Sequence, residues 1–153
     1  MNNFSVQIAD WEHDQKALKA IRHAVFVIEQ KVPEELEWDD QDADAFHLLA
    51  NNNNLEAIGT VRLLKTGQIG RMAVLNEYRS QGAGKLLMDA VLKLAVKNNF
   101  PSVFLHSQAS AVTFYEAFGF TIISEEYEEA GIPHRKMKKS LVELKRPKFM
   151  PYK

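Results

Sequence analysis

The sequence predicts a single α+β domain, and three features support this prediction. Several short runs alternate apolar and polar residues, as half-buried strands do, whereas two longer segments repeat apolar residues every three or four positions, as amphipathic helices do. Three of the strand-like runs follow one another directly, which predicts an antiparallel meander. The 153 residues contain no internal repeat and no linker, so one core accounts for the chain.

The first part of the chain predicts a strand followed by a helix. Residues 4–9 alternate, with their even-numbered apolar side chains on one face, as expected of a half-buried strand. Asp10 is expected to cap the helix, and apolar residues recur at helical spacing from Glu12 to Ile28. Pro33 ends this regular structure.

Residues 34–44 form a strongly acidic segment with two interpretations. The seven carboxylates of this segment either belong to a solvated loop or short helix, or they form an electrostatic funnel for a cationic amine. Arg71, on the predicted fourth strand, has two corresponding roles open to it. It orients an acidic group of a substrate, or it pairs with the acidic segment.

The middle of the chain predicts the meander and a second helix. Residues 46–50 and 55–64 form two strands joined by four asparagines, which tolerate the positive φ of a hairpin turn. Residues 68–74 form the fourth strand, and a broad apolar stripe predicts a helix from Gly84 to about Lys97. The next strand, Val103–Ser107, is expected to lie parallel to the fourth through a right-handed crossover.

The last part of the chain predicts one more helix and a final strand. The helix covers Ala109–Phe118 and is closed by Gly119. An interrupted strand over residues 120–128 and a turn lead into a last strand at His134–Leu141. The tail at residues 145–153 is basic and contains two prolines, so we expect it to be extended or loosely packed.

Composition excludes several classes of function. A net charge of −1 does not point to a general nucleic-acid or membrane-surface binder, and the absence of cysteine excludes disulfides, thiolate metal sites and a cysteine nucleophile. No histidine pair or acidic triplet has the spacing of metal ligands, so no metal is expected. Neither a signal peptide nor a membrane-spanning run is visible, and we expect a cytoplasmic protein.

The turn after the fourth strand, residues 79–84, is the strongest candidate binding site. It leads into a helix N-terminus, where backbone N–H groups lack intrahelical partners, and its glycines allow close approach of an anion. A P-loop would need Ser or Thr where Leu86 stands, and a dinucleotide fingerprint would need a third glycine where Leu87 stands. Neither of those phosphate-binding patterns is present.

The remaining pattern, R-x-x-G-x-G, resembles the pyrophosphate-binding motif of the GNAT superfamily of acyl-coenzyme A N-acyltransferases. About 25 residues downstream, A-x-x-F-Y-x-x-x-G-F at 111–120 resembles a second motif of that superfamily, in the same order. The segments at 25–30 and 131–137, with the acidic segment, are similar to the ElaA-type branch, and the resemblance covers roughly residues 5–142. It implies an N-acetyltransferase domain at residues 1–144. Its fold would be a mixed, mostly antiparallel sheet of six or seven strands flanked by helices on both faces.

The resemblance also implies which residues hold acetyl-coenzyme A as the acyl donor. The turn and the residue after it would bind the pyrophosphate: Arg79, Ser80, Gln81, Gly82, Ala83, Gly84 and Lys85. The pantetheine arm would lie like an added strand along the backbone of Met72, Ala73 and Val74. Phe114 and Gln108 are further donor contacts, although Gln108 stands where the family often has asparagine, and a helix-capping role is its alternative. Tyr115 would assist the thiolate leaving group.

The sequence gives less information about the acceptor than about the donor. Glu29, Glu37 and His134 are candidate substrate contacts, and the general base is open among these three, His106 and a water chain. A small-molecule amine and a peptide amine are both compatible with the sequence, and a homodimer is left open. Two other functions compete with catalysis. One is a non-catalytic acyl-coenzyme A sensor or interaction module, and the other is a generic phosphate-binding domain.

Overall fold

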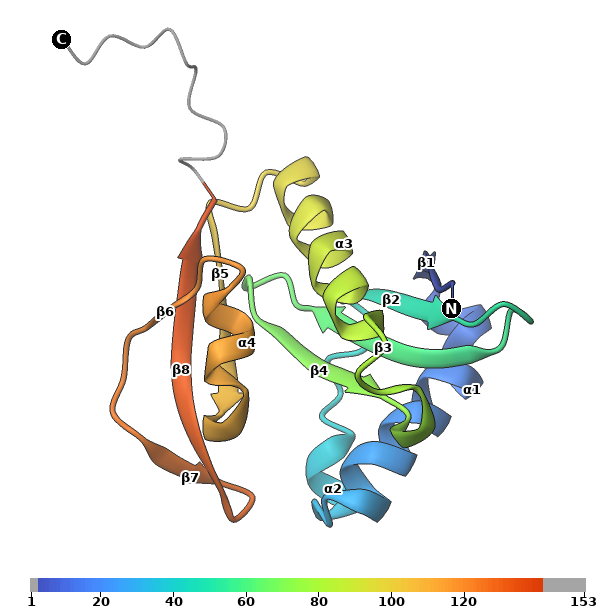
Figure 1. Ribbon diagram of the computed structural model, residues 1–153, viewed down its shortest axis with the longest axis horizontal. Helices are drawn as coiled ribbons and strands as arrows, with labels where there is room; N and C mark the ends of the chain where they lie inside the picture. The colour runs from blue at the N-terminus through green and yellow to red at the C-terminus, as the bar shows by residue number, and fades with distance from the viewer. Residues whose placement is uncertain (1–2, 142–153) are drawn as a thin grey trace, which may run out of the picture. The chain divides into compact units, whose positions relative to one another are not determined.

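The structure, a computed structural model, describes residues 3–141. The chain divides into two compact units, Met1–Leu94 and Ala95–Lys153, and each is described by itself. Figure 1 shows the first unit in blue to yellow-green and the second in yellow to red. The predicted basic tail at 145–153 lies outside the described residues.

The first unit is built on a four-stranded antiparallel sheet, which confirms the predicted meander. Its strands follow the order β1-β2-β3-β4. They are β1 (Ser5–Ala9), β2 (Phe46–Asn51), β3 (Ala57–Leu63) and β4 (Ile69–Val74). The asparagine-rich hairpin between β2 and β3 differs from the prediction in one respect. Its positive φ, 61°, falls on Leu55, while Asn52 closes the turn by accepting hydrogen bonds from the amides of Asn54 and Glu56, both at 2.9 Å.

The predicted helix after Asp10 forms as two different helices. The carboxylate of Asp10 accepts a hydrogen bond from the amide of Glu12 and begins α1 (Trp11–Arg22). A π-helix, η1 (His23–Glu29), continues it, with wider turns such as the 3.0 Å bond from Gln30 N to Val25 O. Pro33 then precedes a single turn, α2 (Glu34–Glu37).

The chain leaves β4 through a short 3₁₀ turn, η2 (Asn76–Tyr78), and enters α3 (Ala83–Lys97). This arrangement of strand, turn and helix is the predicted one. It places the turn at 79–84 directly before the N-terminus of α3.

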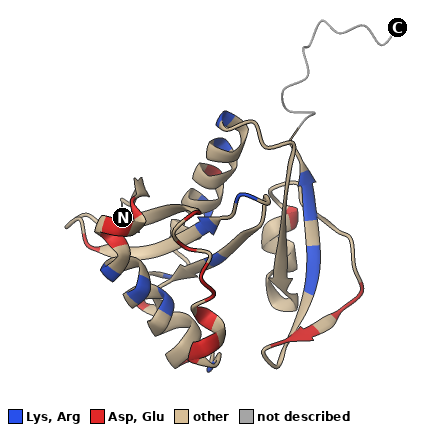
Figure 2. Ribbon diagram, turned by 180° about the vertical axis from the view of Figure 1, so that it is seen from behind, with Lys and Arg blue, Asp and Glu red and all other residues tan. Residues whose placement is uncertain are grey.

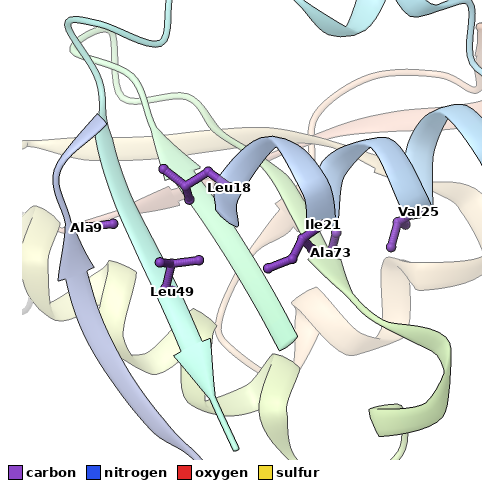
Figure 3. Close-up of a cluster of buried hydrophobic side chains, with 6 residues drawn as sticks. All are labelled: Ala9, Leu18, Ile21, Val25, Leu49 and Ala73. Carbon is purple, nitrogen blue, oxygen red and sulfur yellow. The ribbon is translucent and has the colours of Figure 1, made fainter. Parts of the chain in front are cut away.

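α1 and α3 cover opposite faces of the β1–β4 sheet. Figure 3 shows a buried cluster formed between the helices α1 and η1 and the strands by Ala9, Leu18, Ile21, Val25, Leu49 and Ala73. On the other face a Cβ built on Gly59 would lie 3.1 Å from Leu87 of α3 and 3.5 Å from the Cβ of Ala50. Adjacent strand residues point to opposite faces, so Leu49 and Ala50 mark the two sides of the sheet. The prediction for β1 is wrong in one detail, because Ile8 is 65% exposed and Ala9 is buried instead.

The second unit contains the other four strands. Two of them are long, β5 (Ser102–Gln108) and β8 (Ile132–Ser140), and pair antiparallel over their whole common length. The short strands β6 (Thr121–Ile122) and β7 (Tyr127–Glu129) pair with β8. Between β5 and β6 lie η3 (Ala109–Ala111) and α4 (Val112–Glu116), and Gly119 ends them with φ 93°.

The α+β class is confirmed, but the strand pairing differs from the prediction. Among residues 3–141 all pairs are antiparallel and form two four-stranded sheets, in which β5 pairs with β8. The predicted parallel pairing of Val103–Ser107 with the fourth strand is absent from these sheets. The choice of partner depends on contacts about 30 residues apart, which local periodicity does not encode. No helix in the described part of the chain is both long enough and apolar enough to cross a membrane.

Candidate functional site

The turn between β4 and α3 has the backbone geometry of an anion site. Ser80 and Gly82 have φ values of 63° and 95°, so the turn alternates between ordinary and left-handed conformations. The first helical hydrogen bond of α3 runs from Leu86 N to Gly82 O, so the amides of residues 83–85 precede the helix ladder. A Cβ on Gly82 would meet nothing within 4 Å. The left-handed φ, rather than crowding, therefore favours glycine at this position.

Arg79 connects this turn to the end of η1. Its Nε donates to the carbonyl oxygen of Val74 at 2.8 Å, and its Nη2 donates to Glu29 at 2.6 Å. The second guanidinium nitrogen, Nη1, also pairs with Glu29, so the contact is bidentate. This pairing lowers the pKa of Glu29 and raises that of Arg79. The carboxylate of Glu29, which is predicted to contact the acceptor, therefore forms an ion pair with a residue of the predicted donor turn.

β4 carries a β-bulge at the residues predicted to bind the pantetheine arm. Arg62 on β3 pairs with Gly70, and Thr60 pairs with Ala73, so the single residue between them on β3 faces both Arg71 and Met72. Arg71 has φ 51°, a left-handed conformation that costs a non-glycine residue about 1–2 kcal/mol. The bulge therefore concentrates strain on one arginine in the middle of the strand.

A network of buried and partly buried charges lies on the α1 side of this sheet and joins four segments of the chain: α1, the acidic segment, β3 and β4. It comprises three guanidinium groups and three carboxylates, those of Arg22, Arg62, Arg71, Glu37, Asp39 and Asp42. Arg22, on α1, is fully buried and donates to Glu37 and to Asp42, both at 2.7 Å. Since the formal charges cancel, three against three, the network is electrically neutral.

The two arginines from the sheet complete the network. Arg62 donates to both oxygens of Asp39 at 2.9 Å and to Asp42 at 3.0 Å. Arg71 Nε lies 3.0 Å from Glu37 Oε2, and Arg71 Nη2 lies 3.0 Å from Asp39 Oδ2. Arg71 Nη2 also donates to the backbone carbonyls of Leu36 and Glu37. The acidic segment is thereby fastened to β3, β4 and α1.

The arginines keep the carboxylates of the network ionised. Burial alone would raise the pKa of Asp39, but the hydrogen bonds and charge of Arg62, together with Arg71, lower it to about 2. The pKa of Asp42 is lowered by Arg22 and Arg62 against the same effect of burial. Burial lowers the pKa of neighbouring His47, whose Nε2 donates to the carbonyl oxygen of Asp42 at 2.8 Å. This histidine is consequently neutral and structural.

These contacts change the interpretation of the acidic segment. Glu37, predicted to bind substrate, is only 3% exposed and is paired with two arginines, so it does not fit that role. Three of the seven carboxylates neutralise buried guanidiniums and do not form a funnel. The four that are exposed are Glu34, Glu35, Asp40 and Asp44. Figure 2 shows the acidic residues concentrated on α2 and the segment after it. Of the two roles open to Arg71, pairing with the acidic segment is the one observed.

Tyr115 lies in an aromatic cluster of the second unit. Its ring makes edge contacts with Phe114, at 5.1 Å between centroids, and with Phe120, at 6.1 Å. Phe114 also packs against Phe118 at 5.2 Å, so this predicted donor contact lies in the same cluster. Burial raises the pKa of Tyr115 to about 12, and the phenol is fully protonated near neutral pH.

A second group of polar aromatic side chains lies at the end of β5. His134 on β8 is opposite Gln108 on β5 and Tyr127 on β7, and its ring stacks on that of Tyr127 at 6.1 Å. Its Nδ1 donates to the carbonyl oxygen of Ile132 at 2.7 Å, which leaves Nε2 as the unprotonated nitrogen of the neutral ring. Tyr127 is also hydrogen-bonded to Nδ1 of His106. Gln108 precedes η3 but its side chain makes no capping hydrogen bond, so the capping alternative is wrong.

The predicted site residues are divided between the two units. The donor-turn residues and Met72, Ala73 and Val74 lie in the first unit, while Tyr115, Phe114, Gln108 and His134 lie in the second. Sequence reasoning missed the buried partners Arg22 and Arg62. One signal was available, since Arg22 lies between Ile21 and Val25 in the apolar stripe of the helix predicted over Glu12 to Ile28. No group of three or more His, Cys, Asp or Glu residues within 3–141 has the arrangement of a metal site.

Comparison with known proteins identifies the family. Residues 9–141 match the acetyltransferase (GNAT) domain, and the chain belongs to this family of acyltransferase enzymes.

Individual relatives and structures agree with this assignment. The chain is 35% identical to Protein ElaA of Escherichia coli over 136 residues, which cover 83% of this chain and 88% of ElaA. The crystal structure of E. coli ElaA matches with a TM-score of 0.80 and 32% identity, over 90% of this chain and all of that one. An acyl-CoA N-acyltransferase from Pseudomonas aeruginosa matches with a TM-score of 0.81 and 30% identity, over the same shares. The predicted GNAT resemblance and its ElaA-type branch are confirmed.

Proposed function

We propose that this protein is an acetyl-coenzyme A-dependent N-acetyltransferase that moves an acetyl group directly to a primary amine. The observation that carries the proposal is the left-handed turn at 79–84, which leads from β4 into the N-terminus of α3 and suits a pyrophosphate. The backbone of Met72, Ala73 and Val74 would receive the pantetheine arm. Direct transfer is favoured because the chain contains no cysteine to carry the acetyl group.

In the proposed reaction the neutral amine attacks the thioester carbonyl carbon. The new C–N bond forms as the C–S bond breaks, the amine proton passes to a base, and the sulfur leaves as a thiolate. Backbone amides of β4 are candidates for stabilising the oxyanion of the tetrahedral intermediate.

Tyr115 is the proposed donor to the leaving sulfur. A thiolate whose conjugate thiol has a pKa of ~8.5 is a much weaker base than the phenolate of Tyr115, whose conjugate phenol has a pKa of about 12. Full proton transfer from Tyr115 would therefore be unfavourable, and its hydroxyl is expected to stabilise the thiolate by a hydrogen bond. This role needs the protonated phenol, which burial maintains.

His134 is the base that the geometry supports best. Among the four candidate side chains, Glu37 is buried in ion pairs and Glu29 is paired with Arg79. His106 is a poorer candidate, because its Nδ1 is hydrogen-bonded to the Tyr127 hydroxyl. His134 has its Nδ1 proton held by a backbone carbonyl, so Nε2 carries a lone pair. We propose that this nitrogen receives the proton of the acceptor amine.

Release of free coenzyme A in the presence of an amine panel tests the proposal. A thiol reagent measures the product without background, because the protein has no thiol of its own. Acetyl-coenzyme A at 100 times its dissociation constant should stabilise the fold by ~2.7 kcal/mol, or roughly 5 to 10 °C. Binding without thiol release for any amine would favour the sensor function instead. No binding of any acyl-coenzyme A would refute both.

A further inference from the structure

We propose that Arg71 is a positioning residue for the acyl donor: its ion pairs with the acidic segment hold the left-handed bulge of β4, and the bulge orients the strand backbone that receives the pantetheine arm. This inference rests on the proposed function, because it assigns a purpose to the bulge only where β4 binds the donor. It concerns contacts within the first unit alone. Neither the charge network nor its coupling to the bulge is needed for the family assignment.

The bulge needs a restraint because of the residue that occupies it. Left-handed φ values are common for glycine and uncommon for arginine. Gly70 is adjacent to Arg71, yet it is Arg71 that has φ 51°. An arginine in this conformation persists only when surrounding contacts determine it.

The side chain of Arg71 supplies that restraint through a rigid anchor. Its guanidinium contacts the carboxylates of Glu37 and Asp39, both at 3.0 Å, and the backbone carbonyl of Glu37, also at 3.0 Å. Glu37 is fixed by Arg22, and Asp39 is fixed by the two bonds from Arg62. Arg62 is paired with Gly70 across the β3–β4 ladder, so the anchor connects back to the strand that carries the bulge.

Loss of the bulge would alter the part of β4 that follows it. Ala73 is buried in the α1-side cluster and pairs with Thr60, and Val74 pairs with Gly59. Removing the extra residue would shift β4 by one position and turn these side chains to opposite faces. β4 is also the last strand in the order of its sheet, so its second edge is where the proposed function puts the pantetheine arm. The direction of the Met72 and Ala73 peptide groups at this edge depends on the bulge.

Comparing Arg71→Gly with Arg71→Ala separates the backbone from the side chain. Both substitutions remove the anchor, but only glycine accepts the left-handed φ without strain. In Arg71→Ala the competent bulge should be populated about 5- to 30-fold less, since the strain is no longer opposed. The KM for acetyl-coenzyme A should rise by about the same factor, with kcat and the KM of the amine changed less than about threefold. Arg71→Gly should have a donor KM within about threefold of the wild type.

The controls make the outcome decisive. Wild-type protein is measured first, because failure of acetyl-coenzyme A to bind it refutes the proposed function and not the coupling. Lys65→Ala, an exposed change in the loop before β4, should match the wild type. All assays are run at a temperature where circular dichroism shows each variant folded. Should the Arg71 variants fail to fold, Asp39→Asn weakens the same anchor and should also raise the donor KM alone. An unchanged donor KM in Arg71→Ala, or equal increases in the alanine and glycine variants, would overturn the inference.

Discussion

Replacing Arg22 with alanine should destabilise the protein more than any surface change on the same helix. Arg22 is 0% exposed and makes two charge-assisted hydrogen bonds, to Glu37 and Asp42, and a third to the backbone carbonyl of Glu37. Its removal changes the buried network from three cations and three anions to two cations and three anions. Removing one partner of a buried ion pair costs about 3–5 kcal/mol, because the remaining charge is left without compensation.

The expected loss lies within this range and not above it, since each carboxylate keeps a second partner. Glu37 retains Arg71 and Asp42 retains Arg62. At 2–4 °C for each kcal/mol, the midpoint of thermal unfolding should fall by roughly 6 to 20 °C. The same loss should appear in the free energy of unfolding from a urea titration.

Two spectroscopic signals follow this unfolding. Far-ultraviolet circular dichroism reports the secondary structure, and tryptophan fluorescence reports the network directly, since Trp38 lies over the Arg22 guanidinium at 5.1 Å. Lys16→Ala, an exposed change on α1, is the control and should alter stability by less than about 0.5 kcal/mol. A loss below about 1 kcal/mol in Arg22→Ala would show that the network is solvated, and the argument for a rigid anchor would fail.

Three further predictions concern pH, the donor turn and catalysis. The depressed pKa of Asp39, about 2, contributes stability that is present above its unfolded value of ~3.9 and is lost as the pH falls toward 2. Asp39→Asn should therefore flatten the decrease in the free energy of unfolding at acid pH, measured by urea titration. An unchanged decrease would exclude Asp39 as its source. Gly82→Ala should weaken acetyl-coenzyme A binding by roughly tenfold in a calorimetric titration, because a φ of 95° strains alanine. Steric clash does not contribute, since the added methyl group meets no neighbour. Unchanged affinity would exclude the turn from the donor site. Tyr115→Phe should lower kcat by about 10²-fold with donor binding nearly intact, whereas Thr113→Ala on the same helix should have no effect, and unchanged turnover would exclude Tyr115 from the reaction.

The order of elements could be predicted from the sequence because local patterns encode it. The meander, the Asp10 cap, the turn into α3 and the glycine closing α4 all depend on residues within a few positions of one another. The π-helix after Arg22 could not be predicted, because its apolar spacing resembles that of an α-helix. The pairing of β5 with β8 depends on residues about 30 positions apart, and no nearby signal selects it.

The same distinction applies to the candidate site. The turn at 79–84 was predictable because glycine and a helix start lie side by side in the sequence. The bulge was not, since its left-handed residue is Arg71 and not the adjacent glycine. The charge network pairs residues 15 to 34 positions apart, and a sequence with three arginines and seven nearby carboxylates does not say which of them pair.

The network also reassigns the acidic segment from the acceptor to the donor side of the proposed reaction. Its buried carboxylates hold Arg22, Arg62 and Arg71, and the last of these carries the strained conformation of β4. A carboxylate in such a pair cannot also bind a substrate amine without leaving a buried guanidinium uncompensated. If the segment attracts an amine in the proposed function, only its exposed acidic residues are available for this, and the proposed base lies outside the network. Neutralising the exposed Glu34 and Glu35 should then raise the KM of a cationic amine alone, in a salt-dependent manner, while Asp39→Asn raises the KM of the donor.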